Sequence, residues 1–263
     1  AAMGVLDNTS FVSAITQGLT ATVHTVWQNT PSGQPSNAAK HHLFLMGYPR
    51  SGTTLVENIL ASIPGVSALE ERPTLATTDR EYIAGSQSEI IAGIQSFSQL
   101  DSNSLDQNRK AYWDNVVVSG VPANAPCFVD MDPLKGTRLP FIARLFPEAR
   151  ILIMRRDPRD VVWSCFRTNF AMSSGTLEYT TLERAARHYD ALMRLTELAT
   201  ERLPINFHIV QYHRLVQSFD AETKALCEFA GLEWTEAVRD FDRTAARRGV
   251  STASAGQVNR GLY

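Results

Sequence analysis

The sequence predicts a three-layer α/β fold, with a mostly parallel central sheet and helices on both of its faces. Short apolar runs alternate with helix-like stretches along the 263 residues, as in strands joined by right-handed crossover helices. Hydrophobic residues make up 44% of the chain and charged residues 20%, which is ordinary for a globular protein with a sizeable core. The glycine turn and the charged clusters follow apolar runs, at the sheet edge where open α/β sheets bind ligands.

The first 40 residues are expected to form an N-terminal helix and a linker. Residues 9–28 carry apolar side chains at helical spacing. Residues 29–40 are rich in Pro, Ser, Gly and Asn, a composition typical of linkers. The helix either packs on the main domain, which we place at residues 41–263, or joins it to a region that precedes this chain.

The main domain is expected to alternate strands and helices. Strands are expected at residues 43–46, 66–69, 127–129, 151–154 and 207–210. Helices are expected after the glycine turn, at 77–118 with an interruption at 101–104, at 138–146, after 160, at 182–202 and at 221–230. Gly231 is a candidate C-cap for the last of them. The polar, small-residue tail at 250–260 suits either a mobile closing loop or a frayed end.

Charge and cysteine content exclude several classes of protein. A net charge of -2 leaves no broad basic surface for nucleic acid, so any anion site is local. The three cysteines, Cys127, Cys165 and Cys227, are widely spaced, which favours a reducing, cytoplasmic location over a disulfide framework or a zinc site. No apolar run is long enough for a membrane span, and the start of the chain lacks the regions of a signal peptide. The first and last residues also fit a piece of a longer protein.

The stretch Gly47-Tyr48-Pro49-Arg50-Ser51-Gly52-Thr53-Thr54 has the spacing of a phosphate-binding loop. It follows an apolar run and opens a helix, so backbone N–H groups are expected to converge on one anion. Thr53 replaces the usual lysine, and the cation is Arg50, inside the loop. A guanidinium with several hydroxyls suits a phosphate that leaves as a group, without a metal ion. The alternative is a plain helix start.

Two further clusters come directly after expected strands. Glu70-Glu71 precedes Pro73, and the alternative to a functional role is a solvated turn. Residues 155–160, Arg-Arg-Asp-Pro-Arg-Asp, are followed by Ser164; alone, they would indicate a helix start with Asp157 as its cap.

Taken together, these motifs resemble those of sulfotransferases that use 3'-phosphoadenosine-5'-phosphosulfate (PAPS). Pro-Arg-Ser-Gly-Thr-Thr resembles their 5'-phosphosulfate loop, and Arg156 with Ser164 resembles their 3'-phosphate segment. The chain resembles above all bacterial sulfotransferase domains found behind tetratricopeptide repeats, which in turn resemble tyrosylprotein sulfotransferases. The likeness implies a P-loop-like fold of the sulfotransferase and nucleotide kinase type, PAPS as co-substrate and no metal.

The resemblance also assigns residues. The positions that it implies for PAPS binding are Pro49, Arg50, Ser51, Gly52, Thr53, Thr54, Arg156, Ser164 and Tyr212. It implies Glu71 as general base, with Arg50 and Ser254 at the transferring group. One departure is Met131, where such proteins commonly carry a lysine; Lys135 is a candidate replacement.

The acceptor is expected to bear a hydroxyl group, on a peptide tyrosine, a sugar or a phenol. Two other functions compete with sulfuryl transfer. A small-molecule or nucleotide kinase would use ATP with Mg2+, and Thr53 in place of lysine argues against it. A non-catalytic nucleotide-binding domain is compatible with Met131.

Overall fold

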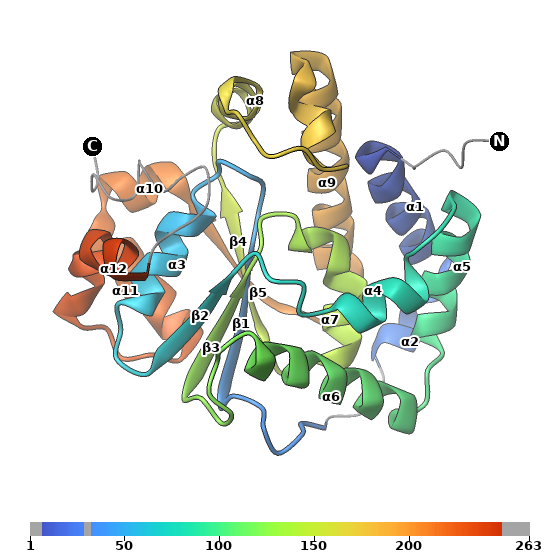
Figure 1. Cartoon of the computed structure of the whole chain (residues 1–263), viewed down its shortest axis with the longest axis horizontal. Coiled ribbons are helices and arrows are strands. Elements are labelled where there is room, and N and C mark those ends of the chain that lie inside the picture. The colour runs from blue at the N-terminus through green and yellow to red at the C-terminus, as the bar shows by residue number, and fades with distance from the viewer. Residues whose placement is uncertain (1–6, 29–32, 249–263) are drawn as a thin grey trace.

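The computed structural model describes residues 7–28 and 33–248, and it confirms the three-layer α/β fold. One five-stranded sheet has the order β2-β3-β1-β4-β5, and all of its neighbouring strands are parallel (Figure 1). The strands are β1 His41–Met46, β2 Val66–Glu70, β3 Cys127–Met131, β4 Arg150–Arg155 and β5 Asn206–Gln211.

Helices cover both faces of the sheet (Figure 1). One face carries α1 Asn8–Ala21, α2 His24–Gln28, α4 Ala76–Tyr82, α5 Gln87–Ser98, α6 Ser102–Val118, α7 Leu139–Leu145 and α9 Leu182–Arg202. The other carries α3 Thr53–Ala61, α10 Tyr212–Gln217, α11 Phe219–Ala230 and α12 Phe241–Arg248. Helix α8, Pro158–Arg167, follows β4. Within the described residues, no helix has the length and apolarity needed to cross a membrane.

The central strands are buried on both faces. In β1, Phe44 and Met46 belong to the apolar cluster on one face of the sheet, where Phe44 lies against Tyr112 of α6 and Phe146. Leu43 and Leu45 belong to the cluster on the opposite face, with residues of α3 and α11. Successive side chains of a strand point to opposite faces, so an all-apolar strand requires apolar cover on both sides. The apolar runs therefore show no alternation of polar and apolar residues, because the strands that they form are buried on both faces.

The strand order places the end of β1 beside the end of β4. The chain leaves β1 through α3 towards β2, and it leaves β4 through α8 and α9 towards β5, on the other side. Loops that diverge in this way leave a crevice at the carboxyl edge of a parallel sheet. The motifs at residues 47–54 and 155–160 flank this crevice.

Helix α1 belongs to the main core. Val12, Ile15 and Leu19 are fully buried in the same apolar cluster as the sheet residues, and the helix packs on α5 and α9. The helix therefore packs on the main domain. The expected helix at 9–28 is interrupted at Thr22, whose backbone is extended, and continues as α2.

Other boundaries differ from expectation for local reasons. The helical region at 77–118 has a second break, where Gly85 adopts a positive φ and Ser86 caps α5. The helix expected at 138–146 begins as the 3-10 turn Lys135–Arg138. Gly231 is left-handed at the end of α11, which confirms its role as C-cap. Helices α10 and α12 were not predicted, and the tail at 250–260 lies outside the described residues.

A buried polar network lies beneath β1 and β3. Lys135 forms an ion pair with Asp130, and both side chains are almost fully buried. Thr74 and Tyr112 donate hydrogen bonds to the same carboxylate, at 2.7 and 2.9 Å, and His42 contacts the Tyr112 hydroxyl at 2.7 Å. These bonds offset the cost of desolvating a carboxylate and an ammonium group.

Removal of the Lys135 ammonium should strongly destabilise the fold. Lys135→Met leaves the Asp130 carboxylate buried without its cation, and we expect the free energy of unfolding to fall by about 3–5 kcal/mol. Lys110→Met is the matched control because the Lys110–Asp114 pair is exposed, and it should cost less than about 1 kcal/mol. Urea unfolding measures both. Equal losses would contradict the role assigned to the network.

Candidate functional site

Residues 47–54, which we call the phosphate loop after the spacing of their sequence, lie between β1 and α3. Ser51 closes a tight turn, because its N–H donates to the carbonyl oxygen of Tyr48 (3.0 Å) and its Oγ accepts from the N–H of Tyr48 (3.3 Å). Arg50 and Gly52 both have a left-handed backbone, with φ of 71° and 110°. Gly52 is the N-cap of α3, and no side chain caps this helix start. A helix start of this kind binds anions through its first N–H groups.

Four of the residues expected to bind PAPS contact one another beside this loop. The Nε of Arg50 donates to Ser164 Oγ at 3.0 Å. The Nη1 of Arg156 donates to the carbonyl oxygen of Arg50 at 3.3 Å, and its guanidinium lies over the Tyr212 ring, 4.4 Å from the centroid. These side chains come from the β1 loop, the end of β4, α8 and the start of α10. The fold thus joins segments that are far apart in sequence.

Three of these four residues, Arg50, Arg156 and Ser164, border a cavity of about 320 Å³. Its lining consists of Arg50, Arg156, Asp160, Trp163, Ser164, Arg167 and Thr168. With three arginines against one aspartate, the cavity is positively charged. The Nε of Arg156 is buried and has no hydrogen-bond partner among the described residues. A phosphate group would supply the charge and the acceptor atoms that these guanidinium groups need.

Four residues of this lining were not predicted. These are Asp160, Trp163, Arg167 and Thr168, at the spacing i, i+3, i+7 and i+8. Ser164, at i+4, lies on the same side of α8, and Thr168 is the C-cap of this helix. This spacing marks one face of a helix. Extending the prediction from Ser164 along the helical period would have found them.

Glu71 lies at the end of β2, on the same edge of the sheet but outside this cavity. Its backbone is left-handed (φ 51°), and its N–H donates to the carbonyl oxygen of Met131 at 2.7 Å. Although the side chain is accessible to solvent, partial burial raises its pKa to about 7, assisted by the negative charges of Asp132, Glu70 and Glu57. β2 lies two strands from β1, a separation of about 10 Å at the usual strand spacing.

The structure gives Lys135 a different role from the one considered for it. Met131 is fully buried and packs in the apolar core on the α3 side of the sheet. Lys135 is held by Asp130 and lies 6.0 Å from the centroid of the Phe44 ring, in the core on the other side. Its ammonium is engaged there, which argues against its replacing the lysine missing at Met131. Ser254 lies outside the described residues.

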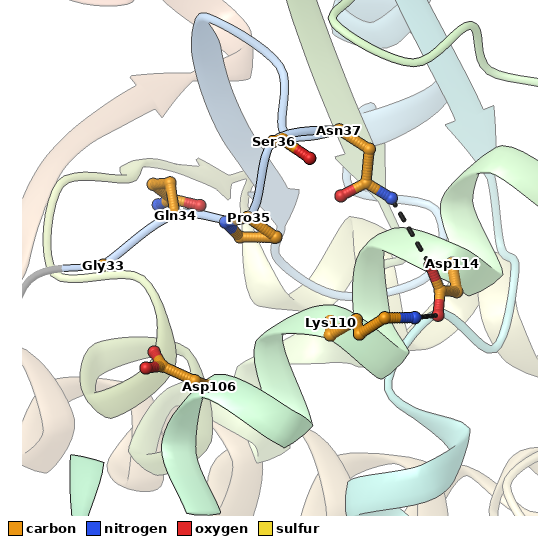
Figure 2. Close-up of a pocket in the computed structure, with 8 residues that line it drawn as sticks. All are labelled: Gly33, Gln34, Pro35, Ser36, Asn37, Asp106, Lys110 and Asp114. Carbon is orange, nitrogen blue, oxygen red and sulfur yellow. Dashed lines mark hydrogen bonds and ion pairs between the residues drawn. The ribbon is translucent and has the colours of Figure 1, made fainter. Parts of the chain in front are cut away.

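A larger cavity, of about 620 Å³, lies at the other end of the sheet. It is lined by residues 33–37 and by Asp106, Lys110 and Asp114 of α6 (Figure 2). Its charged side chains are already paired: Lys110 with Asp114 at 2.6 Å, and Asp106 with Arg109 at 2.7 Å. The amino ends of parallel strands are also not where such sheets bind ligands. The smaller cavity at the carboxyl edge is therefore the candidate site.

Comparison with known proteins identifies the family. The profile of the Sulfotransferase family matches residues 42–236, which include all five strands and both motifs of the crevice. The chain belongs to this family. Within residues 7–28 and 33–248, no group of three or more His, Cys, Asp or Glu side chains is arranged to hold a metal ion.

Two relatives of this sulfotransferase-family chain match most of its length. An uncharacterized protein of Aquifex aeolicus is 30% identical over 88% of the chain and 30% of its own length. Protein-tyrosine sulfotransferase 1 of Danio rerio is 27% identical over 79% of the chain and 58% of its own length. The chain thus spans between about a third and three fifths of these two relatives.

Among solved structures, the sulfotransferase domain of the Synechococcus PCC 7002 olefin synthase shares the fold. Its TM-score is 0.50 at 18% sequence identity, and the match covers 88% of this chain and 90% of that domain.

Gly52 is a position where the loop has no room for an added side chain and where the backbone has a positive φ. A Cβ there would lie 2.8 Å from the Tyr212 ring and 3.0 Å from Met154 Cε. We expect Gly52→Ala to lower the free energy of unfolding by about 1–3 kcal/mol through backbone strain and by about 1–3 kcal/mol more through overpacking.

Gly120→Ala is the matched control for the strain. Gly120 also has a positive φ (101°), but within the described part of the chain no heavy atom lies within 4 Å of the added Cβ. Thermal or urea unfolding of both variants isolates the contact with Tyr212. An equal loss of unfolding free energy in the two variants would show that the contact of the added Cβ with the Tyr212 ring is not destabilising.

Proposed function

We propose that this chain transfers a sulfuryl group from PAPS to a hydroxyl acceptor. The observation that carries the proposal is the contact of Arg50, Arg156, Ser164 and Tyr212 beside the phosphate loop. Membership of the sulfotransferase family supports the reaction class. A nucleotide with a phosphate at each end suits two anion sites so close together.

Each end of PAPS has its own set of groups in this proposal. The loop at residues 49–54 holds the 5'-phosphosulfate through the backbone N–H groups that follow Pro49 and through hydroxyls that include those of Thr53 and Thr54. Arg156 and Ser164 hold the 3'-phosphate, with the free Nε–H of Arg156 as an additional donor. Tyr212, which packs beneath the Arg156 guanidinium, lies near the adenine.

The chemistry is an in-line displacement at sulfur. The acceptor oxygen forms a bond to sulfur, the bond between sulfur and the bridging oxygen of the 5'-phosphate breaks, and 3'-phosphoadenosine-5'-phosphate (PAP) leaves with the electron pair. Glu71 takes the proton of the acceptor hydroxyl, for which a pKa of about 7 is well matched near neutral pH. Arg50, together with Ser254, stabilises the negative charge that builds on the leaving phosphate.

The acceptor class follows from the relatives. A hydroxyl-bearing acceptor fits the family, and the protein-tyrosine sulfotransferases among the relatives make a peptide tyrosine the first acceptor to try. Sugars and phenols are the alternatives, because the donor site imposes no choice among them. A cytoplasmic location remains a prediction from the cysteine pattern.

A second candidate function is nucleotide binding without turnover. The buried Met131, together with the engagement of Lys135 by Asp130, favours it, since both remove a cation from the expected leaving-group site. Transfer of labelled sulfate from PAPS to a tyrosine peptide decides between the two. A kinase would instead use ATP with Mg2+.

Loss of the Arg156 guanidinium should weaken binding of PAP. We expect Arg156→Ala to raise the dissociation constant by about 10- to 100-fold, because charge-assisted hydrogen bonds to the 3'-phosphate are lost. Arg159→Ala is the matched control: Arg159 is exposed and pairs with Asp157 at 2.7 Å, so its loss should have little effect. Calorimetric titration with PAP, and with ATP and Mg2+, measures both. Unchanged affinity in Arg156→Ala, or tighter binding of ATP than of PAP, would refute the donor assignment.

The rate of transfer should follow the ionisation of Glu71. Because only the carboxylate accepts a proton, kcat/KM should rise with pH through about 7 and then level off. Glu71→Gln should lower the rate by about 100- to 10,000-fold and leave PAP affinity nearly intact. Asp132→Asn is the control: it removes the negative charge with the largest effect on Glu71 and should move the midpoint to lower pH. A pH profile that Asp132→Asn leaves unmoved, or full activity in Glu71→Gln, would exclude Glu71 as the base.

A further inference from the structure

A chain of hydrogen bonds connects the phosphate loop with the first helix. The hydroxyl group of Tyr48 lies 2.7 Å from His188 Nδ1, and His188 Nε2 lies 2.8 Å from Asn8 Oδ1. Tyr48 is 1% exposed and His188 is 0% exposed. The hydrogen bonds therefore run from the loop, through α9, to the start of α1, and the tyrosine and histidine among them are buried.

The partners determine the direction of the bonds. An amide oxygen only accepts, so His188 Nε2 carries the proton and donates to Asn8. Nδ1 is then the acceptor, and the Tyr48 hydroxyl donates to it. Burial lowers the pKa of His188 to about 4, so the ring is neutral near pH 7, as this arrangement requires.

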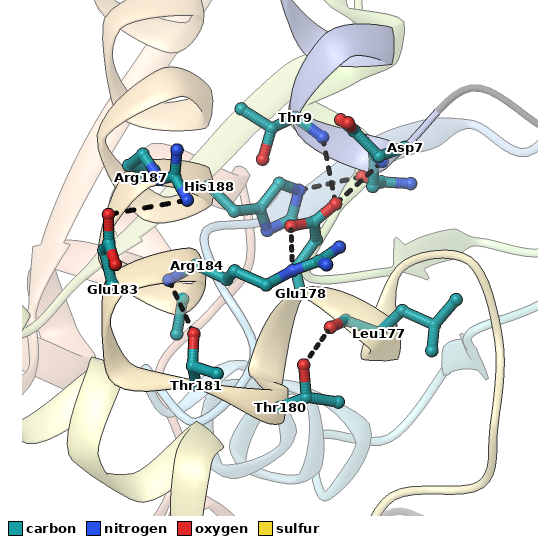
Figure 3. Close-up of polar contacts among 12 residues, drawn as sticks. Asp7, Thr9, Leu177, Glu178, Thr180, Thr181, Glu183, Arg184, Arg187 and His188 are labelled. Atoms are coloured by element: carbon teal, nitrogen blue, oxygen red, sulfur yellow. Dashed lines mark hydrogen bonds and ion pairs between the residues drawn. The ribbon is translucent and has the colours of Figure 1, made fainter.

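Asn8 is itself fixed at the start of α1. Its backbone N–H and that of Thr9 donate to Glu178 Oε1, at 2.9 and 3.3 Å. Figure 3 shows Glu178 and His188 lying together beneath Asp7 and Thr9. A carboxylate at a helix N-terminus is stabilised by the helix dipole. Asn8, the last residue in this series of hydrogen bonds, is thus held in place by the buried Glu178 carboxylate.

Tyr48 links this anchor to the anion site. Its backbone forms both hydrogen bonds of the turn with Ser51, and its ring packs against Tyr179 and Tyr189, with centroids 6.0 and 5.0 Å away. A shift of Tyr48 would therefore displace the turn and the first N–H groups of α3. Anion binding by backbone groups depends on their being held in place beforehand.

We propose that Tyr48, His188 and Asn8 are positioning residues that hold the phosphate loop in its binding geometry, so that α1 takes part in donor binding. The inference rests on the proposed function. It gives a role to a helix that lies outside residues 42–236, the part matched by the family profile.

The test compares ligands that occupy one or both phosphate sites. Tyr48→Phe removes the hydroxyl, and Asn8→Ala removes the last acceptor but keeps the backbone bond to Glu178. Each should weaken binding of PAP and of adenosine 5'-phosphate about 3- to 10-fold, the usual effect of one buried hydrogen bond. Binding of adenosine 3'-phosphate should change less than about 2-fold, because the Arg156 site is untouched. Tyr82→Phe, which removes a tyrosine hydroxyl bonded to Glu81 on α4, is the control and should change none of the three.

Hydrogen exchange of the ligand-free protein separates the inference from the proposed function. In Tyr48→Phe and Asn8→Ala, the amides of Ser51 and Val56, which donate to Tyr48 and Gly52, should exchange faster than in the unaltered chain, and those of α6 should not. Unchanged exchange at Ser51 and Val56, or equal loss of affinity for the 5'- and 3'-phosphates, overturns the positioning role. Failure of the unaltered chain to bind PAP overturns the proposed function alone, and the exchange rates then decide the inference.

Discussion

The close approach of the phosphate loop to β4 is the constraint on which the site depends. A Cβ on Gly47 would lie 2.7 Å from the carbonyl oxygen of Met154, so only glycine lets the loop leave β1 directly against its neighbour. β1 and β4 are paired in register up to Met46 and Ile153. The basic segment that follows β4 therefore reaches the loop within a few residues, and Arg156 bonds to the backbone of Arg50. The two proposed anion sites lie side by side as a result.

Charge is divided along the carboxyl edge of the sheet. Arginine side chains gather where β1 and β4 end, whereas Glu71 and Asp132 follow β2 and β3. The separation has a chemical advantage. In the proposed function, a donor anion is attracted to the basic half, while burial, assisted by the carboxylates of the acidic half, keeps the pKa of Glu71 near 7. The proposed binding of a bisphosphate by a chain with a net charge of -2 depends on this local concentration of cations.

Much of this arrangement could be predicted from sequence because it is local. The apolar runs, the glycine spacing and the cluster after β4 each lie within a few residues, and the edge of a parallel sheet brings their ends together. The strand order could not be predicted, since it depends on which crossovers pack. The contact of Tyr48 with His188 spans 140 residues and leaves no local pattern. The roles of Glu71 and Ser254 remain predictions.

A crystal structure of the protein with PAP bound tests the central claim most directly. The account predicts one nucleotide across the crevice, with its 5'-phosphate on the N–H groups at the start of α3 and its 3'-phosphate within hydrogen-bond distance of Arg156 and Ser164. A nucleotide bound elsewhere, or one whose 3'-phosphate points away from β4, would contradict it.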